Sequence, residues 1–231
     1  MALQQDGNAS PEEPNTTNTS LAADDYSDCE QPETCFEFSG HRLKITQHSK
    51  TLFGVSAFIW DAGIFLCKYI EKQNMDFTGK KVIELGSGTG LVGIFAGLLG
   101  ANVTLTDRWH VLDQIKSNVF ANIPASALDR CKVCALLWGT DHTHFPSDYD
   151  FIFGSDIVYN KDFYTLLPKT LEHLSNAGTE IYLASAMRSQ KIVYFHEVTL
   201  PQYFKCDLVC NDENRLISIY RLTKKYTEPG K

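Results

Sequence analysis

The sequence predicts an α/β fold: a doubly wound, mostly parallel sheet with an antiparallel hairpin at its C-terminal end. From Lys80 onward, short apolar runs rich in β-branched residues alternate with stretches of helical periodicity. Such repeated strand and helix units form parallel strands covered by helices on both faces. The last two strand-like runs, 205–209 and 216–220, are separated by six residues. Six residues are too few for a crossover helix, so this pair should be antiparallel.

Each element can be assigned in chain order. Apolar residues alternate on both sides of the Gly40-His41 turn, which predicts a short hairpin. Apolar residues at helical spacing predict an amphipathic helix over about 56–72. Strands are then expected at 82–85, 103–106, 131–137, 151–153 and 181–184, and helices at 91–99, 111–121, 162–174 and 192–200.

Length and composition favour one domain with extensions. The chain has 231 residues, of which 43% are hydrophobic, enough for one sizeable core. Residues 1–33 are polar and acidic and predict a disordered tail. We expect residues 34–78 to form a hairpin and helix packed on the core, and residues 79–225 to form the main α/β domain.

Charge and cysteine usage narrow the partners and the compartment. Nine of the 28 acidic residues and none of the 21 basic ones lie in residues 1–40, so the body is nearly neutral. A neutral body disfavours nucleic acid as a partner. No apolar stretch is long enough for a membrane span, and no secretory leader is apparent. Seven irregularly spaced cysteines suit a reducing compartment, so we expect a cytoplasmic protein, with nuclear or cytoskeletal association left open.

A glycine-rich turn follows the first strand of the repeating pattern. Residues 82–85 run into Gly86-Ser87-Gly88-Thr89-Gly90, where missing side chains let the backbone turn sharply and approach a ligand. Counted from Gly88 to Gly93, the glycines match a nicotinamide dinucleotide loop. Because the strand should end at Leu85, we favour the register that begins at Gly86. That spacing, after the acidic Glu84, is typical of S-adenosylmethionine-binding loops.

Two further residues follow the next strands. Asp107 ends the second strand, where a carboxylate can accept hydrogen bonds from both ribose hydroxyls of a nucleoside. Its alternative is to cap the following helix. Trp138 follows the third strand and can lie against an adenine ring, or else serve as a core or lid residue.

The fourth strand ends in Gly154-Ser155-Asp156-Ile157-Val158-Tyr159. Asp156 can accept a hydrogen bond from an incoming amine, and Tyr159 can wall its approach. Capping of the next helix would explain Asp156 but not the pair. Methyl transfer to an amine needs a neutral nitrogen in line with the methyl group, and desolvation supplies it by lowering the amine pKa. A dedicated strong base is therefore not required.

A metal site is not expected. Cys131, Cys134, Cys206 and Cys210 could in principle bind zinc. However, Cys131 and Cys134 are three residues apart in a strand, so their side chains point to opposite faces. The histidines lack ligand spacing, and His142 and His144 are expected in a loop.

With these residues in view, the chain resembles the eukaryotic seven-β-strand protein lysine methyltransferases, a class I, Rossmann-like group, from about Gly40 to Arg221. The shared landmarks are Trp60-Asp61, the loop from Glu84 to Gly90, Asp107, Trp138-Gly139 and the D-x-x-Y pattern from Asp156 to Tyr159. This resemblance implies S-adenosylmethionine as cofactor. It also implies cofactor contacts from Trp60, Glu84, Gly86, Ser87, Gly88, Gly90, Asp107, Trp138 and Ser155, with Asp156 and Tyr159 facing the target lysine.

Within the family, the resemblance is to members that methylate translation elongation factor 1-alpha, which implies that substrate and a monomeric enzyme. The same chemistry on another nucleotide-binding protein, an Hsp70-type chaperone or an AAA ATPase, is the alternative. A nicotinamide-dependent oxidoreductase and a non-catalytic binding module are the other classes. The first conflicts with the preferred glycine register and the second with the intact site residues.

Overall fold

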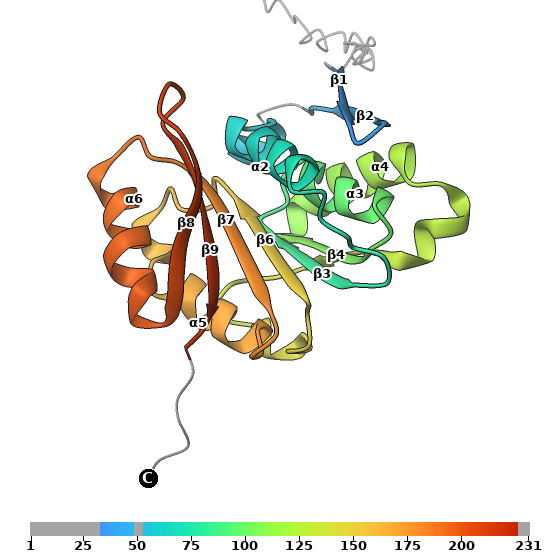
Figure 1. Ribbon diagram of the computed structural model, residues 1–231. Coiled ribbons are helices and arrows are strands. Elements are labelled where there is room, and N and C mark those ends of the chain that lie inside the picture. Colours follow the sequence, from blue (N-terminus) through green and yellow to red (C-terminus); the bar gives the residue numbers. More distant parts are fainter. Residues whose placement is uncertain (1–32, 49–52, 226–231) are drawn as a thin grey trace, which may run out of the picture. The chain divides into compact units, whose positions relative to one another are not determined.

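The computed structural model describes residues 33–48 and 53–225, which contain the whole predicted α/β unit (Figure 1). The predicted tail, residues 1–33, lies outside these ranges apart from Glu33, the first residue of strand β1. The prediction of disorder therefore falls outside the described residues.

The described residues form a seven-stranded sheet with the order β5-β4-β3-β6-β7-β9-β8. The pairs among β3 to β7 are parallel, whereas β9 pairs antiparallel with both β7 and β8. This confirms the predicted mostly parallel sheet with a C-terminal antiparallel hairpin. The strands are β3 Lys81–Leu85, β4 Asn102–Asp107, β5 Cys131–Ala135, β6 Phe151–Ser155, β7 Glu180–Ala186, β8 Phe204–Asp212 and β9 Ile217–Lys224.

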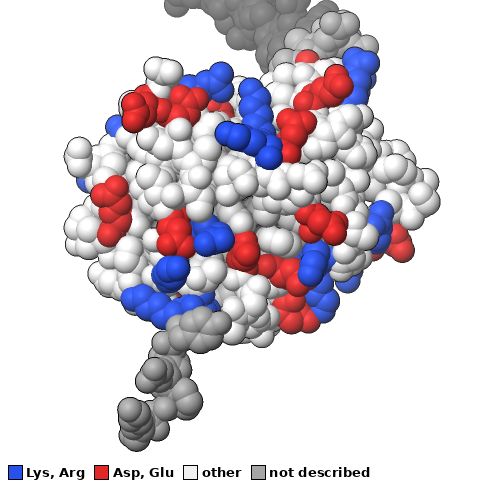
Figure 2. Space-filling view, in the orientation of Figure 1, with Lys and Arg blue, Asp and Glu red and all other residues white. Residues whose placement is uncertain are grey.

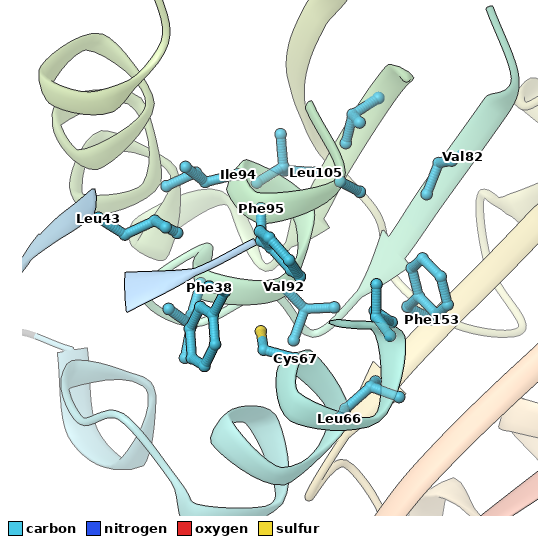
Figure 3. Packing of buried hydrophobic residues seen from close by; sticks show 14 of the residues in the cluster. Phe38, Leu43, Leu66, Cys67, Val82, Val92, Ile94, Phe95, Leu105 and Phe153 are labelled. Carbon is cyan, nitrogen blue, oxygen red and sulfur yellow. The ribbon is translucent and has the colours of Figure 1, made fainter. Parts of the chain in front are cut away.

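Helices cover the two faces of the sheet (Figure 1). Helices α2 (Asp61–Lys72), α3 (Leu91–Leu98) and α4 (Leu112–Asn122) pack on one face, and α5 (Leu166–Leu174) packs on the other. Helix α6 (Gln190–Tyr194) leads into a segment whose Phe195 and Leu200 are buried in the same core as α5. Alternate strand residues point to opposite faces, so Val82 joins the first core and Ile83 the second. Figure 3 shows the first core, where Phe95 of α3 and Leu66 of α2 meet the sheet.

The chain order of the strands creates a crevice at the carboxyl edge of the sheet. From β3 the chain proceeds outward through β4 and β5, and it then returns to the other side of β3 to form β6 and β7. In open α/β sheets, ligands bind at the carboxyl ends of the strands where this direction reverses. The loops that follow β3, β4, β5 and β6 are therefore the ones to inspect for a site.

The N-terminal hairpin is built from β1 (Glu33–Phe38) and β2 (His41–Thr46). Its residues Phe38, Leu43 and Ile45 are buried in the same core as α2 and α3. Strand β2 also contacts α4, because the N–H of Lys44 donates to Oδ1 of Asn122 at 2.7 Å. The hairpin thus extends the first core.

The predicted helix over 56–72 is wrong in its first turn. Residues Gly54–Ala57 form a 3-10 turn, the chain is then extended to Trp60, and α2 begins at Asp61. The break has two hydrogen-bonded causes: the N–H of Ile59 donates to Gln47 Oε1 at 3.0 Å, and Trp60 Nε1 donates to the Val55 carbonyl at 2.9 Å. These bonds replace helical ones and turn the Trp60 side chain toward the crevice.

Other boundaries also shift. The strand expected at 131–137 ends at Ala135, and the chain turns where the Leu137 N–H donates to Oδ1 of Asp141 at 2.7 Å. The helix expected at 162–174 is divided into a 3-10 turn, Lys161–Phe163, and α5. The helix expected at 192–200 is α6 followed by a π-helical turn, Phe195–Thr199.

Candidate active site

The glycine-rich loop joins the end of β3 to the start of α3. Gly86, Gly88 and Gly90 have positive φ angles of 60°, 56° and 83°, a region that glycine enters without steric cost. A Cβ on Gly86 would lie 2.7 Å from Cγ2 of Ile157, so this position also requires close packing. Strand β3 ends at Leu85, which supports the register that begins at Gly86 over the nicotinamide register.

Asp107, the last residue of β4, ties this loop to the sheet. Its side chain is 8% exposed, and its carboxylate accepts hydrogen bonds from the N–H groups of Gly88 at 2.9 Å and Arg108 at 2.7 Å. Burial raises the pKa of this carboxyl. The turn that follows, Trp109–Val111, has no side-chain cap, so the helix-capping alternative is not what the structure shows. Each carboxylate oxygen keeps acceptor capacity for a ligand.

Glu84 is a second buried carboxyl beside the loop. It is 2% exposed, and its Oε2 accepts a hydrogen bond from the N–H of Gly93 at 3.0 Å inside α3. Burial raises its pKa to about 8. A cationic ligand nearby would oppose this effect and favour the ionised carboxylate.

These groups surround a pocket, here called the loop chamber, at the carboxyl ends of β3 to β6. Trp138 forms part of its wall and packs edge-on against Phe163, with ring centroids 5.0 Å apart. Leu136 and Ile157 add apolar surface. Eight of the predicted cofactor residues line this chamber: Trp60, Glu84, Gly86, Ser87, Gly88, Asp107, Trp138 and Ser155.

Gly90, the ninth predicted cofactor residue, lies outside the chamber lining. It is the N-cap of α3, and a Cβ there would meet Leu105 at 3.2 Å and Ile94 at 3.3 Å. Its role in this structure is to let the loop enter the helix against a packed core.

Asp156 follows β6 in a left-handed conformation, with φ of 50°. Its Oδ1 accepts a hydrogen bond from the N–H of Ala186 at 2.8 Å, and the backbone N–H of Ala62 at the start of α2 also favours the ionised carboxyl. Its buried Oδ2 has no hydrogen bond of normal geometry among the described residues. Burial raises the pKa of this carboxyl. An unpartnered buried oxygen is costly and calls for a functional explanation. Tyr159 stands three residues later, 55% exposed.

A second chamber adjoins the first. Four residues line both chambers and are here called the neck: Val55, Trp60, Asp156 and Tyr159. Beyond the neck, the second chamber is lined by Val158, Ser185, Ala186, Arg188 and Ile192. The predicted catalytic pair thus lies between a chamber bearing the glycine loop and another at the end of β7.

Sequence reasoning missed a polar row on α4 that supports the loop. Gln114 Nε2 donates to the Gly88 carbonyl at 2.9 Å, and Asn118 Nδ2 donates to the Thr89 carbonyl at 2.9 Å. Both side chains are 1% exposed. Their spacing of four residues, continued by Asn122, places them on one helix face, and this row of amide side chains at helical spacing was the available signal.

The cysteines considered for zinc do not converge. Cys131 and Cys134 lie on β5, whereas Cys206 and Cys210 lie on β8, at the opposite edge of the sheet. Within residues 33–48 and 53–225, no three His, Cys, Asp or Glu side chains gather as a metal site.

Comparison with known proteins now identifies the family. A sequence model described as lysine methyltransferase matches residues 37–200, which include the loop, Asp107 and the Asp156-Tyr159 pair. The chain belongs to this lysine methyltransferase family. Membership excludes the nicotinamide-dependent reading and makes the protein an enzyme with S-adenosylmethionine as its cofactor.

Several similar proteins are named as lysine methyltransferases. EEF1A lysine methyltransferase 3 of Xenopus tropicalis is 49% identical over 200 residues, covering 86% of this chain and 88% of the relative. The Mus musculus protein of that name is 46% identical over 211 residues, covering 91% and 88%. Protein N-lysine methyltransferase METTL21A of Danio rerio is 43% identical over 190 residues, covering 82% and 86%.

Solved structures share the fold. The Thermus thermophilus 16S rRNA N2 G1207 methyltransferase, in complex with AdoMet and guanosine, aligns with a TM-score of 0.62 at 15% identity, covering 84% of this chain and 50% of that one. A putative RNA methyltransferase from Pyrococcus horikoshii aligns with a TM-score of 0.56 at 19% identity, covering 79% and 92%. These likenesses place the methyltransferase in the class I fold.

The loop chamber fits S-adenosylmethionine. Glycines at alternate positions of the loop, a buried carboxylate with acceptor capacity at Asp107, and an aromatic wall at Trp138 match a nucleoside. Glu84, a carboxyl that a positive ligand would ionise, suits the cationic end of the cofactor. The donor set therefore agrees with the cofactor that the family uses.

Proposed function

We propose that this methyltransferase transfers methyl groups to a lysine of translation elongation factor 1-alpha. The observation that carries the target is the 49% and 46% identity to two enzymes named for that substrate, over most of both chains. The protein N-lysine methyltransferase METTL21A of Danio rerio is 43% identical. Because this identity is only slightly lower than the other two, a different nucleotide-binding protein, such as an Hsp70-type chaperone or an AAA ATPase, is the alternative target.

On the cofactor side, we assign one role to each wall of the loop chamber. Asp107 accepts hydrogen bonds from the ribose hydroxyls. It also accepts hydrogen bonds from the N–H groups of Gly88 and Arg108, and the bond from Gly88 holds the glycine loop in place. Trp138 lies along the adenine, and Glu84 and Trp60 stand near the charged methionine end. When bound there, S-adenosylmethionine supplies a methyl group on a positive sulfur, which makes that carbon electrophilic.

On the acceptor side, Asp156 and Tyr159 receive the target lysine at the neck. Oδ2 of Asp156, unpartnered in the structure, accepts an N–H of the ε-amine and orients it. The aromatic walls of Trp60 and Tyr159 remove water, which lowers the lysine pKa and leaves a neutral nitrogen. With S-adenosylmethionine bound, the nitrogen lone pair would form a bond to the methyl carbon while the carbon–sulfur bonding pair stayed on sulfur, and one proton of the methylated amine would leave to solvent.

The substrate is a protein, and we propose that the enzyme acts on it as a monomer in the cytoplasm, independently of nucleic acid and membranes. Six cysteines in the described residues carry free thiols, which supports a reducing compartment. Basic and acidic side chains are intermixed on the face shown in Figure 2, unlike a phosphate-binding surface. No helix among the described residues is long and apolar enough to cross a membrane.

The test is to incubate the purified protein with labelled S-adenosylmethionine and recombinant elongation factor 1-alpha, and then to map modified lysines by mass spectrometry. Asp156→Ala is run beside Asp162→Ala, which removes an exposed carboxylate outside both chambers. One methylated lysine, lost with Asp156→Ala and kept with Asp162→Ala, supports the proposal. Labelling of another protein in cell extract but not of elongation factor 1-alpha refutes the target.

A further inference from the structure

One wall of the second chamber carries a polar group that the proposed mechanism leaves unused. Ser185 of β7 lines this chamber, although its residue is only 2% exposed. Its Oγ lies 2.8 Å from Nε2 of His196, which is completely buried. The chamber wall therefore contains a hydroxyl whose position depends on a buried imidazole behind it.

His196 is fixed by its backbone conformation and by packing. It lies in the π-helical turn Phe195–Thr199, a rare helix form that frequently marks functional sites. Its ring stacks on Tyr220, with centroids 4.7 Å apart and an interplanar angle of 12°. Burial lowers the pKa of His196 to about 3, so the imidazole is too weak a base to take a proton from the lysine.

The hydrogen bonds indicate which nitrogen carries the proton. Nδ1 of His196 is buried and has no partner among the described residues. A proton on Nδ1 would be an unpaired buried N–H, whereas a proton on Nε2 is donated to Ser185 Oγ. The second tautomer uses one lone pair of Ser185 and leaves the other for a donor inside the chamber.

We propose that Ser185, positioned by His196, is a second hydrogen-bond acceptor for the ε-amine of the target lysine and thereby limits how many methyl groups are added. This inference rests on the proposed lysine site at the neck. Asp156 and Ser185 line the same second chamber, so both can face one amine. A neutral primary amine has two N–H groups, and when both are accepted the lone pair is left for the methyl carbon.

The arrangement treats successive methyl transfers differently. After the first transfer, a methyl group replaces one N–H of the amine. One of the two acceptors, Asp156 or Ser185, then has no N–H to accept and lies against the methyl group. Leaving a buried acceptor unpaired is unfavourable, so the second and third transfers are slower than the first. Removing the Ser185 hydroxyl weakens this discrimination, because the chamber then has one acceptor fewer that the methylated amine can leave unpaired.

The experiment compares Ser185→Ala and Ser185→Cys with the matched control Ser218→Ala. Cysteine keeps nearly the volume of serine but is a weak hydrogen-bonding group. Ser218 stands opposite Ser185 in the β7-β9 register, is 7% exposed, and donates to Asn211 Oδ1 at 3.3 Å, away from both chambers. Its loss therefore removes a nearby hydroxyl without touching the chamber.

The wild-type enzyme is first used to find which lysine is methylated, in elongation factor 1-alpha or in another protein of the extract, and this step tests the proposed target. Three quantities are then measured for every variant, with that same lysine as the substrate. They are S-adenosylhomocysteine affinity by calorimetry, kcat/KM for the first methyl, and the ratio of higher to single methylation at equal turnover. With both Ser185 variants, we expect unchanged affinity, about a tenfold lower kcat/KM and a raised ratio. Ser218→Ala should match the wild type. An unchanged methylation ratio, or a loss of S-adenosylhomocysteine affinity, would overturn the proposal.

Discussion

The two sides of the neck are built in opposite ways. On the loop side, Asp107 and the α4 residues Gln114 and Asn118 hold the glycine loop through hydrogen bonds to its backbone. On the acceptor side, Asp156 has an unpartnered oxygen and a left-handed backbone, and Tyr159 is largely exposed. A chamber for an invariant cofactor is prepared in advance, whereas a chamber for a protein side chain is left to be completed by its substrate.

This contrast predicts which property each substitution should change. A change on the loop side should alter cofactor affinity or stability, because the groups there already have partners. A change on the acceptor side should alter turnover with little effect on cofactor binding, because those groups gain partners only with the substrate.

The largest expected effect is on turnover at the neck. Asp156→Ala should lower the rate of methyl transfer at least about 1000-fold, since the amine loses the acceptor that orients it. S-adenosylhomocysteine affinity, measured by calorimetry, should stay within about twofold of the wild type. A parallel loss of that affinity would show that Asp156 belongs to the cofactor chamber and would break the comparison.

The next effect is on the opposite side. Asp107→Ala should weaken cofactor binding about 100-fold, because two ribose hydroxyls lose a charged acceptor and the Gly88 N–H loses its partner. Turnover at saturating cofactor should fall much less than with Asp156→Ala. Titration of both variants with S-adenosylhomocysteine, beside turnover at high cofactor, separates the two roles. Unchanged affinity with Asp107→Ala would refute the ribose assignment.

The same contrast explains which features could be predicted from sequence. The sheet, its C-terminal hairpin and the glycine register follow from local patterns, because strand ends and glycines carry their own signals. The kink before α2 could not be predicted, since Gln47 is distant in sequence and supplies the hydrogen bond that extends Ile59. Ser185 was missed for a related reason: its meaning depends on His196, which reaches it only through tertiary packing.

Glu84 gives a smaller and pH-dependent effect. Its pKa is about 8 in the folded protein against an ordinary value of 4.5. A raised carboxyl pKa contributes stability that is fully present below about pH 4.5 and is lost as the pH rises toward 8. Without cofactor, unfolding free energy should therefore fall by about 2 kcal/mol from pH 6 to 7.5 through this group. Glu84→Gln should remove that slope in urea titrations, and an equal slope in both proteins would contradict the assignment.

The smallest effect tests whether the α4 residues support the loop or only the helix. Asn118 bonds both the Thr89 carbonyl of the loop and the backbone of Thr46 in β2, whereas Asn122 bonds only Lys44 of β2 and its own helix. Asn118→Ala should lower the unfolding free energy by about 1.5 kcal/mol and Asn122→Ala by about 1 kcal/mol.

Because one of its lost bonds holds the loop, Asn118→Ala should also weaken S-adenosylhomocysteine binding severalfold, while Asn122→Ala should leave that affinity unchanged. Thermal unfolding and calorimetry on the same two variants measure both quantities. If both variants lose stability but neither loses affinity for S-adenosylhomocysteine, the loop keeps its shape without help from α4. Asp107 and the positive-φ glycines would then be sufficient to hold the cofactor chamber in its binding conformation.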